Sequence, residues 1–312
     1  MMVQVNEGPR RRSHSTTQLH DSSSSSSTTT SSTRSKLALL KIFAGGISIT
    51  ALFAKLGVLG TPYTNQMIGQ DILAALFCAT GAYVVTQLVS VAHNRHGLSS
   101  IIARKLIHTL TGPLFTMSWV LFSTNDVGAR VFAGLVTMIN AYKLYKQATD
   151  TDDGGNDISL AKAVSRSGDV KEALGGPFIY IGVLQFLIWA FWRDSMAAVV
   201  SICTMCVGDG LADLVGRKYG KNNAWFFASK DNRKSMVGTL AFAVGSFVAS
   251  VGIIQLFAAT GCVTAGVAVT AIWDKLLLIC VACSIVELIP FGDDNYTVPI
   301  AALILGKLLL PS

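Results

Sequence analysis

Long apolar stretches alternate with short polar segments along most of the chain. Each stretch is close to the length of about 20 residues that a helix needs to cross a bilayer, and the last one is shorter. They cover residues 37–58, 70–92, 106–123, 127–145, 176–192, 195–215, 236–257, 266–289 and 297–310. The pattern predicts an all-α fold, a polytopic integral membrane bundle with about eight or nine transmembrane helices that occupies residues 37–312.

The first 36 residues differ in kind from the rest of the chain. Seventeen of them are Ser or Thr, and five are Lys or Arg against two acidic residues. Such a segment buries too little apolar surface to offset the entropy lost on ordering, so we expect it to be disordered. A Ser-rich, Arg-bearing and acid-poor start is also typical of an organelle transit peptide, and composition does not separate the two interpretations.

Composition and charge support a membrane protein. With 51% hydrophobic and 14% charged residues, the chain has too little polar surface for a soluble globule. If the segments alternate across the bilayer, nineteen of the 25 Lys and Arg residues lie in loops on the N-terminal side, and only Arg193 lies in an opposite loop. The N-terminal side should therefore face the cytosol or the stroma, and the net charge of +7 requires no nucleic acid partner. The six cysteines lie in or beside apolar segments, which favours buried packing over disulfide or metal chemistry.

The same alternation brings every unusual polar motif to that one membrane face. A single functional site at this face is the simplest prediction. The motifs are "ARKLIHTLTG" at 103–112, "SRSGDVKEALGGP" at 165–177, "GDGLADLVGRKYGK" at 208–221, "KDNRKSMVGT" at 230–239 and "ELIPFGDDNYTVP" at 287–299.

Asp209 and Asp213 are the most informative pair in these motifs. They are four residues apart and so lie on one helical face, where two carboxylates repel unless a cation is near. Mg²⁺ suits this position, because it prefers oxygen ligands and binds one or two carboxylates together with substrate phosphates. Gly208 and Gly210 flank Asp209 and allow a ligand to approach the backbone. The alternative is that both acids only pair with the basic residues that follow.

Basic residues and a second acidic group accompany this pair. A loop that mixes Gly with Lys and Arg beside paired acids is suited to a polyphosphate and its metal. Glu287, Asp293 and Asp294 lie close together with no Lys or Arg beside them, and they form either a polar turn or part of a metal site. The basic candidates are Arg217, Lys218, Lys221, Arg233 and Lys234, followed by Ser235, and a separate patch of Arg104, Lys105 and His108.

Taken together, the motifs resemble those of the phytol kinase and farnesol kinase family, whose members are integral membrane polyprenol kinases related to dolichol kinase and phosphatidate cytidylyltransferase. The resemblance covers about residues 100–310 in the expected order. No Walker phosphate loop, protein-kinase motif or nucleophile elbow is present. The sequence departs from the family pattern at Val170 and Ala173 and in a local insertion at 149–164, which bears on substrate choice more than on reaction type.

The resemblance implies transfer of the γ-phosphoryl group of a nucleotide, CTP in this family, to the hydroxyl of an isoprenoid alcohol such as phytol. Charge neutralisation and alignment dominate such a transfer. On this reading the catalytic candidates are Asp209, Asp213, Glu287 and Asp294, and the Mg²⁺ ligands are Asp209, Asp213 and Asp293. Glu287, Asp293 and Asp294 bind a metal or activate the alcohol. The nucleotide-binding candidates are Gly208, Gly210, Arg217, Lys218, Lys221, Arg233, Lys234, Ser235, Arg104 and Lys105.

Two other classes of function compete with this one. A cytidylyltransferase would join CMP to a lipid phosphate, and a transporter would use the acids as an ion pathway. Transporters place ionisable groups near the bilayer midplane, whereas these lie at one interface. The Ser-rich start and the phytol resemblance favour a plastid membrane, and an ordinary disordered tail favours the endoplasmic reticulum. The sequence leaves open the alcohol, the nucleotide base and the oligomeric state.

Overall fold

Helices make up most of the described structure, as the apolar pattern predicts. The computed structural model describes residues 41, 44–50, 63–124, 127–149, 170–226, 234–263, 269–289 and 293–311. The predicted disorder of residues 1–36 falls outside these ranges. Four helices are long and apolar enough to cross a membrane: Asn65–Arg95, Met196–Tyr219, Met236–Ala259 and Val269–Leu288. The all-α membrane class is therefore confirmed, and the total of eight or nine spans stays a prediction.

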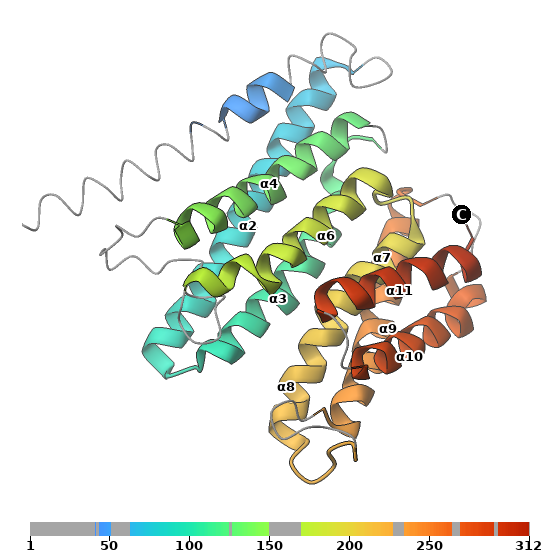
Figure 1. The fold of residues 1–312 in the computed structure, drawn as a ribbon. Coiled ribbons are helices and arrows are strands. Elements are labelled where there is room, and N and C mark those ends of the chain that lie inside the picture. Colours follow the sequence, from blue (N-terminus) through green and yellow to red (C-terminus); the bar gives the residue numbers. More distant parts are fainter. Residues whose placement is uncertain are drawn as a thin grey trace, which may run out of the picture.

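The N-terminal group of helices contains α2 (Asn65–His96), α3 (Ser100–Met117), α4 (Val127–Thr149) and α6 (Gly176–Ala190), and it lies on one side of the molecule (Figure 1). In this group α2 packs on α3 and α4, and α4 packs on α6. The hydroxyl of Thr64 caps α2 by accepting from the amide of Met67 at 3.2 Å. Gly97, at a φ of 66°, ends α2 in the left-handed conformation that glycine adopts without strain. The short η2 turn (Val170–Leu174) precedes α6.

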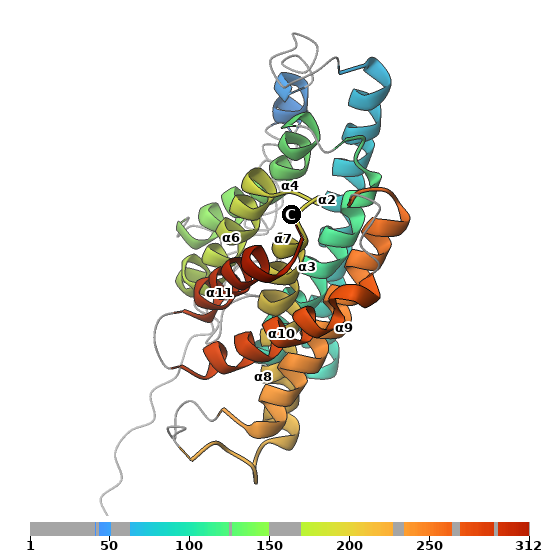
Figure 2. The ribbon, with the colours of Figure 1, turned by 90° about the vertical axis from the view of Figure 1, so that its right-hand side faces the viewer.

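The C-terminal group begins with one continuous helix made of three parts. These are α7 (Met196–Cys203), the π-helical segment η3 (Thr204–Gly208) and α8 (Asp209–Tyr219). The group is completed by α9 (Met236–Ala259), η4 (Val269–Ile272), α10 (Trp273–Leu288) and α11 (Asp294–Leu309). Figure 2 shows α8 running beside the start of α9 beyond the other helices, and these two helices pack on each other. The two groups meet where α3 contacts η3 and α8 and where α6 contacts α11.

Apolar side chains on the outer faces indicate contact with lipid. On α9, Leu240, Val244 and Val248 recur every four residues and are more than half exposed. Because residues four apart share a helical face, they form an apolar stripe that water would not favour. The stripe is the expected surface of a helix in a bilayer.

Arg193, the one basic residue in the loops of the opposite side, does not serve as a topology signal. Its guanidinium is buried and donates from one nitrogen to the carbonyls of Trp119, at 2.5 Å, and Phe122, at 2.8 Å. These carbonyls end the short helix η1 (Ser118–Leu121) that follows α3. Trp192 stacks on Trp119 with ring centroids 4.7 Å apart, which closes this end of the bundle. The charge asymmetry between the two sides is therefore stronger than the sequence count suggests.

Gly210 sets how closely α8 approaches α3. A Cβ atom at this position would lie 1.8 Å from the Oγ1 atom of Thr109 and 2.9 Å from its Cβ atom. Thr109 cannot easily turn away, because β-branched side chains are restricted and its hydroxyl donates to the carbonyl of Lys105 at 2.7 Å. Only glycine fits at this crossing.

We expect Gly210→Ala to lower the stability of the protein in detergent by about 1–3 kcal/mol, because the added methyl group forces the two helices apart. The matched control is Gly182→Ala on α6, where a Cβ atom meets nothing within 4 Å. That control should leave stability unchanged or raise it by up to about 1 kcal/mol, since alanine is the better helix former. Thermal unfolding of both variants measures the difference, and equal effects would contradict the close packing of α3 and α8.

Candidate active site

A cavity of about 540 Å³ lies among α2, α3, α4 and α6 and reaches α8, the start of α9 and the start of α11. Its two ends differ in chemistry. Charged and polar groups gather at the end near the start of α3, and apolar side chains line the remainder. The polar end consists of Arg104, Lys105, His108, Asp209, Lys234, Asp293, Asp294 and Asn295. Gly176 and Pro177 also line the cavity, so the structure gathers residues from all five sequence motifs around one space.

The first ion pair of the site joins α3 to α8. The ammonium of Lys105 donates to Oδ2 of Asp209 at 2.7 Å, and both side chains are nearly buried. Nε2 of His108 lies 3.5 Å from the same oxygen and 2.8 Å from the carbonyl of Met205 in η3. The His108 ring also packs on Tyr180 of α6, with ring centroids 4.2 Å apart. Asp209 is therefore held from two sides at the wall of the cavity.

The second ion pair joins the start of α9 to the end of α10. The ammonium of Lys234 lies 2.9 Å from Oε1 of Glu287 and 3.5 Å from Oδ2 of Asp294. It also donates to the backbone carbonyl of Glu287. Burial raises the pKa of Asp294 above its ordinary value, and the Lys234 ammonium opposes that rise. One cation thus holds two carboxylates from neighbouring helices at the polar end of the cavity.

The start of α6 completes this end of the cavity. A Cβ atom at Gly176 would lie 3.0 Å from Nδ2 of Asn295, 3.6 Å from Oδ2 of Asp293 and 3.9 Å from a guanidinium nitrogen of Arg104. The first turn of α6 contains no acidic residue. The positive end of the α6 dipole and the Arg104 guanidinium therefore lie at the cavity, an arrangement that suits an anion such as phosphate.

Asp293 and Ser235, two of the predicted site residues, act as helix caps. Oδ1 of Asp293 accepts from the backbone amide of Asn295 at 2.9 Å and from its side-chain amide at 2.6 Å, which caps α11. Asp293 nevertheless lines the cavity. The buried hydroxyl of Ser235 accepts from the amide of Gly238 at 3.1 Å and caps α9.

Asp213 lies one turn beyond Asp209 and does not line the cavity. Its Oδ1 atom accepts from Nε of Arg217 at 2.7 Å, and the Arg217 side chain is about half exposed. Its Oδ2 atom is buried and has no hydrogen-bond partner in the part of the chain that the structure describes. Half of this carboxylate is thus in the pair with a basic residue that the sequence leaves open as an alternative, and the other half is buried outside the cavity.

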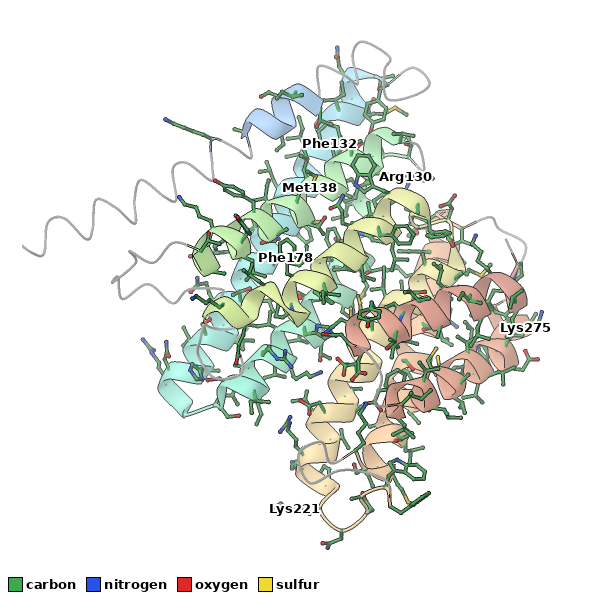
Figure 3. All side chains as sticks on the ribbon, viewed as in Figure 1. Arg130, Phe132, Met138, Phe178, Lys221 and Lys275 are labelled. Carbon is green, nitrogen blue, oxygen red and sulfur yellow. The ribbon has the colours of Figure 1, made fainter. Side chains whose placement is uncertain are left out.

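The other predicted nucleotide-binding residues lie away from the cavity lining. Gly208 packs against the ring of Phe242 and Gly210 against Thr109, so both glycines serve helix contacts. Lys218 is exposed at the end of α8, and its ammonium lies 5.0 Å from the centre of the Tyr219 ring. Lys221 is exposed beyond the end of α8, at the lower tip of the molecule in Figure 3. Arg233 lies outside the described residues.

The carboxylates of the site can hold a metal ion only when a bound ligand supplies further oxygen atoms. Among the described residues, no three or more His, Cys, Asp and Glu side chains are arranged to hold a metal ion. Mg²⁺ usually needs only one or two carboxylates when phosphates and waters supply the other oxygens. Asp209, Asp293 and Asp294 line one cavity, whereas Asp213 lies outside it. The three lining residues fit a Mg²⁺ ion that arrives with a triphosphate.

The sequence did not single out the residues of the apolar part of the cavity. Most of them come from the interiors of α2, α3, α4 and α6, where apolar residues face lipid, core and cavity alike. The one available signal was polar residues inside apolar helices, such as Thr137 and Asn140 of α4. The lining residues outside the quoted motifs are Ala82, Thr86, Phe115, Val136, Thr137, Asn140, Leu144, Tyr180, Ile181 and Leu184. Five more lie within the motifs but were not named as candidates: Ile107, Thr111, Gly176, Pro177 and Ile289.

Comparison with known proteins finds relatives that are named as phytol kinases. The chain is 34% identical over 252 residues to "Probable phytol kinase, chloroplastic" of Zea mays, which covers 78% of each chain. It is 34% identical over 256 residues to the protein of the same name in Triticum aestivum, with 80% of each chain covered. It is 28% identical over 264 residues to "Phytol kinase 1, chloroplastic" of Arabidopsis thaliana, with 84% of each covered. No family model matches the chain. No solved structure matches it.

We expect Lys234→Met to lower stability in detergent by about 3–5 kcal/mol, because it leaves the Glu287 carboxylate buried without its cation. Adding Glu287→Met removes that charge as well and should restore most of the loss. The control is Arg217→Met, which breaks an ion pair whose arginine side chain is about half exposed. This change should cost less than about 0.5 kcal/mol. Melting temperatures of the three variants measure the effect. If the double variant is no more stable than Lys234→Met, the buried pair is not what holds α9 to α10.

Proposed function

The chain belongs to the phytol kinase family, and we propose that it transfers the γ-phosphoryl group of CTP to the hydroxyl of an isoprenoid alcohol such as phytol. The observation that carries this proposal is the cavity, which joins a charged end near the membrane face to an apolar interior among helices. An amphiphilic alcohol needs this combination, because its tail is stable in an apolar space while its hydroxyl must reach a phosphate. Other isoprenoid alcohols, farnesol among them, share the same chemistry.

The charged end contains what phosphoryl transfer requires. The hydroxyl oxygen of the alcohol attacks the γ-phosphorus, and the bond to the β–γ bridging oxygen breaks to release the nucleoside diphosphate. The transferring group carries negative charge throughout, so positive groups must surround it. We assign Arg104 and the N-terminus of α6 to the phosphates. Lys105 orients Asp209 rather than a phosphate, because the two side chains already pair at 2.7 Å. Lys234 likewise pairs with Glu287, at 2.9 Å, and so holds carboxylates rather than a phosphate.

The hydroxyl proton needs an acceptor at the same end. We assign this role to Asp294, which lines the cavity and is less tightly paired than Glu287. Because burial raises the pKa of Asp294, its carboxylate is a better base than an ordinary aspartate. Lys234 bonds to both carboxylates and holds Asp294 in place.

We further propose that Mg²⁺ accompanies the nucleotide, held by Asp209 and Asp293, which both line the cavity. When bound, the ion neutralises charge on the triphosphate and aligns its terminal group. The chain itself supplies the carboxylates and keeps them at the membrane face. The names of the relatives support a plastid membrane as the location. We place the active site on the stromal face because the basic loops of the sequence gather on that side.

We expect Asp209→Asn to lower phytol kinase activity by at least about a hundredfold, the scale seen when a charged group that stabilises phosphoryl or acyl transfer is removed. Asp274→Asn is the matched control, since Asp274 is an exposed aspartate at the opposite end of α10. It should retain full activity. Both proteins are assayed in detergent with phytol and CTP after gel filtration shows that they remain monodisperse. Full activity of Asp209→Asn would show that the Asp209 carboxylate has no part in the reaction.

A labelling experiment separates phosphoryl transfer from cytidylyl transfer. Membranes that contain the protein are incubated with phytol and with CTP labelled at either the γ or the α phosphorus. We expect only the γ label to enter the lipid fraction, because a kinase transfers the terminal phosphoryl group. Membranes with Asp209→Asn give the background. Entry of the α label would show that the protein transfers CMP, and the kinase proposal would be wrong.

A further inference from the structure

The apolar part of the cavity extends well beyond the charged end. Along α3 the lining includes Lys105 and Phe115, which are ten residues apart and so about 15 Å apart along an α-helix. Along α4, which runs the other way, it extends from Leu144 down to Val136. Leu144 packs with Ala103 and Ile107 beside the charged end, whereas Val136 belongs to the central core. Phe115 of α3, Val136 of α4 and Leu184 of α6 therefore mark the deep end.

The polar side chains along this part of the cavity are satisfied by their own helices. The hydroxyl of Thr111 donates to the carbonyl of Ile107 at 2.7 Å, and that of Thr137 donates to Gly134 at 2.9 Å. The side-chain amide of Asn140 donates to the carbonyl of Val136 at 2.9 Å. The threonine donors are used, and Asn140 keeps one amide hydrogen and its carbonyl oxygen. Most of the surface that these walls offer a ligand is therefore methyl and methylene groups. The walls are suited to a hydrocarbon rather than to a second polar group.

From this geometry we propose that the space between α3, α4 and α6 is a tail chamber for the isoprenoid chain, and that Val136 at its deep end sets the chain length. The inference rests on the proposed function, because the hydroxyl at the other end of the chain must lie beside Asp209. Val136 is buried among core residues and lines the deep end of the chamber. Packed side chains at that point exclude a longer isoprenoid chain, because a protein interior accommodates little added volume.

The test exchanges Val136 for a larger and for a smaller residue and compares alcohols that differ by one isoprene unit. Val136→Phe fills the deep end, so we expect kcat/KM for phytol to fall at least about tenfold, while kcat/KM for the shorter farnesol changes less than about twofold. Val136→Ala deepens the chamber and should raise kcat/KM for a prenol one unit longer than phytol, relative to phytol. Retained farnesol kinase activity shows that the Val136→Phe protein is folded.

Met138 provides the matched control on the same helix. It lies two residues from Val136, is 52% exposed and does not line the cavity, and it is labelled on α4 in Figure 3. Met138→Phe should leave the preference among alcohols unchanged. If the Val136 variants change activity equally toward all alcohols, or leave the preference unchanged, the chamber holds another hydrocarbon such as a bilayer acyl chain and the inference is overturned. If the unaltered protein phosphorylates no alcohol, it is the proposed function that fails.

Discussion

The ion pair between Lys105 and Asp209 is the constraint on which the site depends. It places a cation from α3 and an anion from α8 in contact at 2.7 Å, with both side chains nearly buried. Burying one of these charges alone would be costly, so each helix end is stable in this position only because the other is there. Gly210 permits the approach, since any side chain at that point would collide with Thr109 of α3. Packing and charge therefore fix the same helix crossing.

The convergence of the motifs on one membrane face was predictable because alternation across a bilayer is a strict rule. A helix must satisfy its backbone hydrogen bonds internally to cross lipid, so each apolar stretch reverses the side on which the next polar segment lies. That reasoning brings Arg104, Asp209, Lys234 and Asp294 to one side, and the structure places all four around one cavity. Arg193, the exception in the charge count, is buried against carbonyl groups.

The detailed roles were not predictable, because they depend on which neighbour each side chain meets in the packed bundle. The sequence spacing places Asp209 and Asp213 on one helical face, yet Asp209 pairs with Lys105 of α3 whereas Asp213 pairs with Arg217 of its own helix. A π-helical segment just before Asp209 shifts the helix register, which the period of 3.6 residues does not reveal. Ser and Asp occur both in ligand sites and at helix N-caps. Only the hydrogen bonds that Ser235 and Asp293 make in the folded protein show that they cap helices.

The two ends of the cavity are held by different forces, and this separates reaction type from substrate choice. Buried charges fix the polar end, where moving one partner leaves another charge without compensation. Close packing of apolar side chains such as Phe115 and Val136 fixes the deep end. A change of side-chain volume there shifts the neighbouring side chains and leaves Asp209 in place. Substitutions in the interior of α4 can therefore alter the accepted chain without altering the phosphoryl-transfer groups. Relatives that share the charged motifs but differ in these helix interiors can therefore accept different alcohols while carrying out the same phosphoryl transfer.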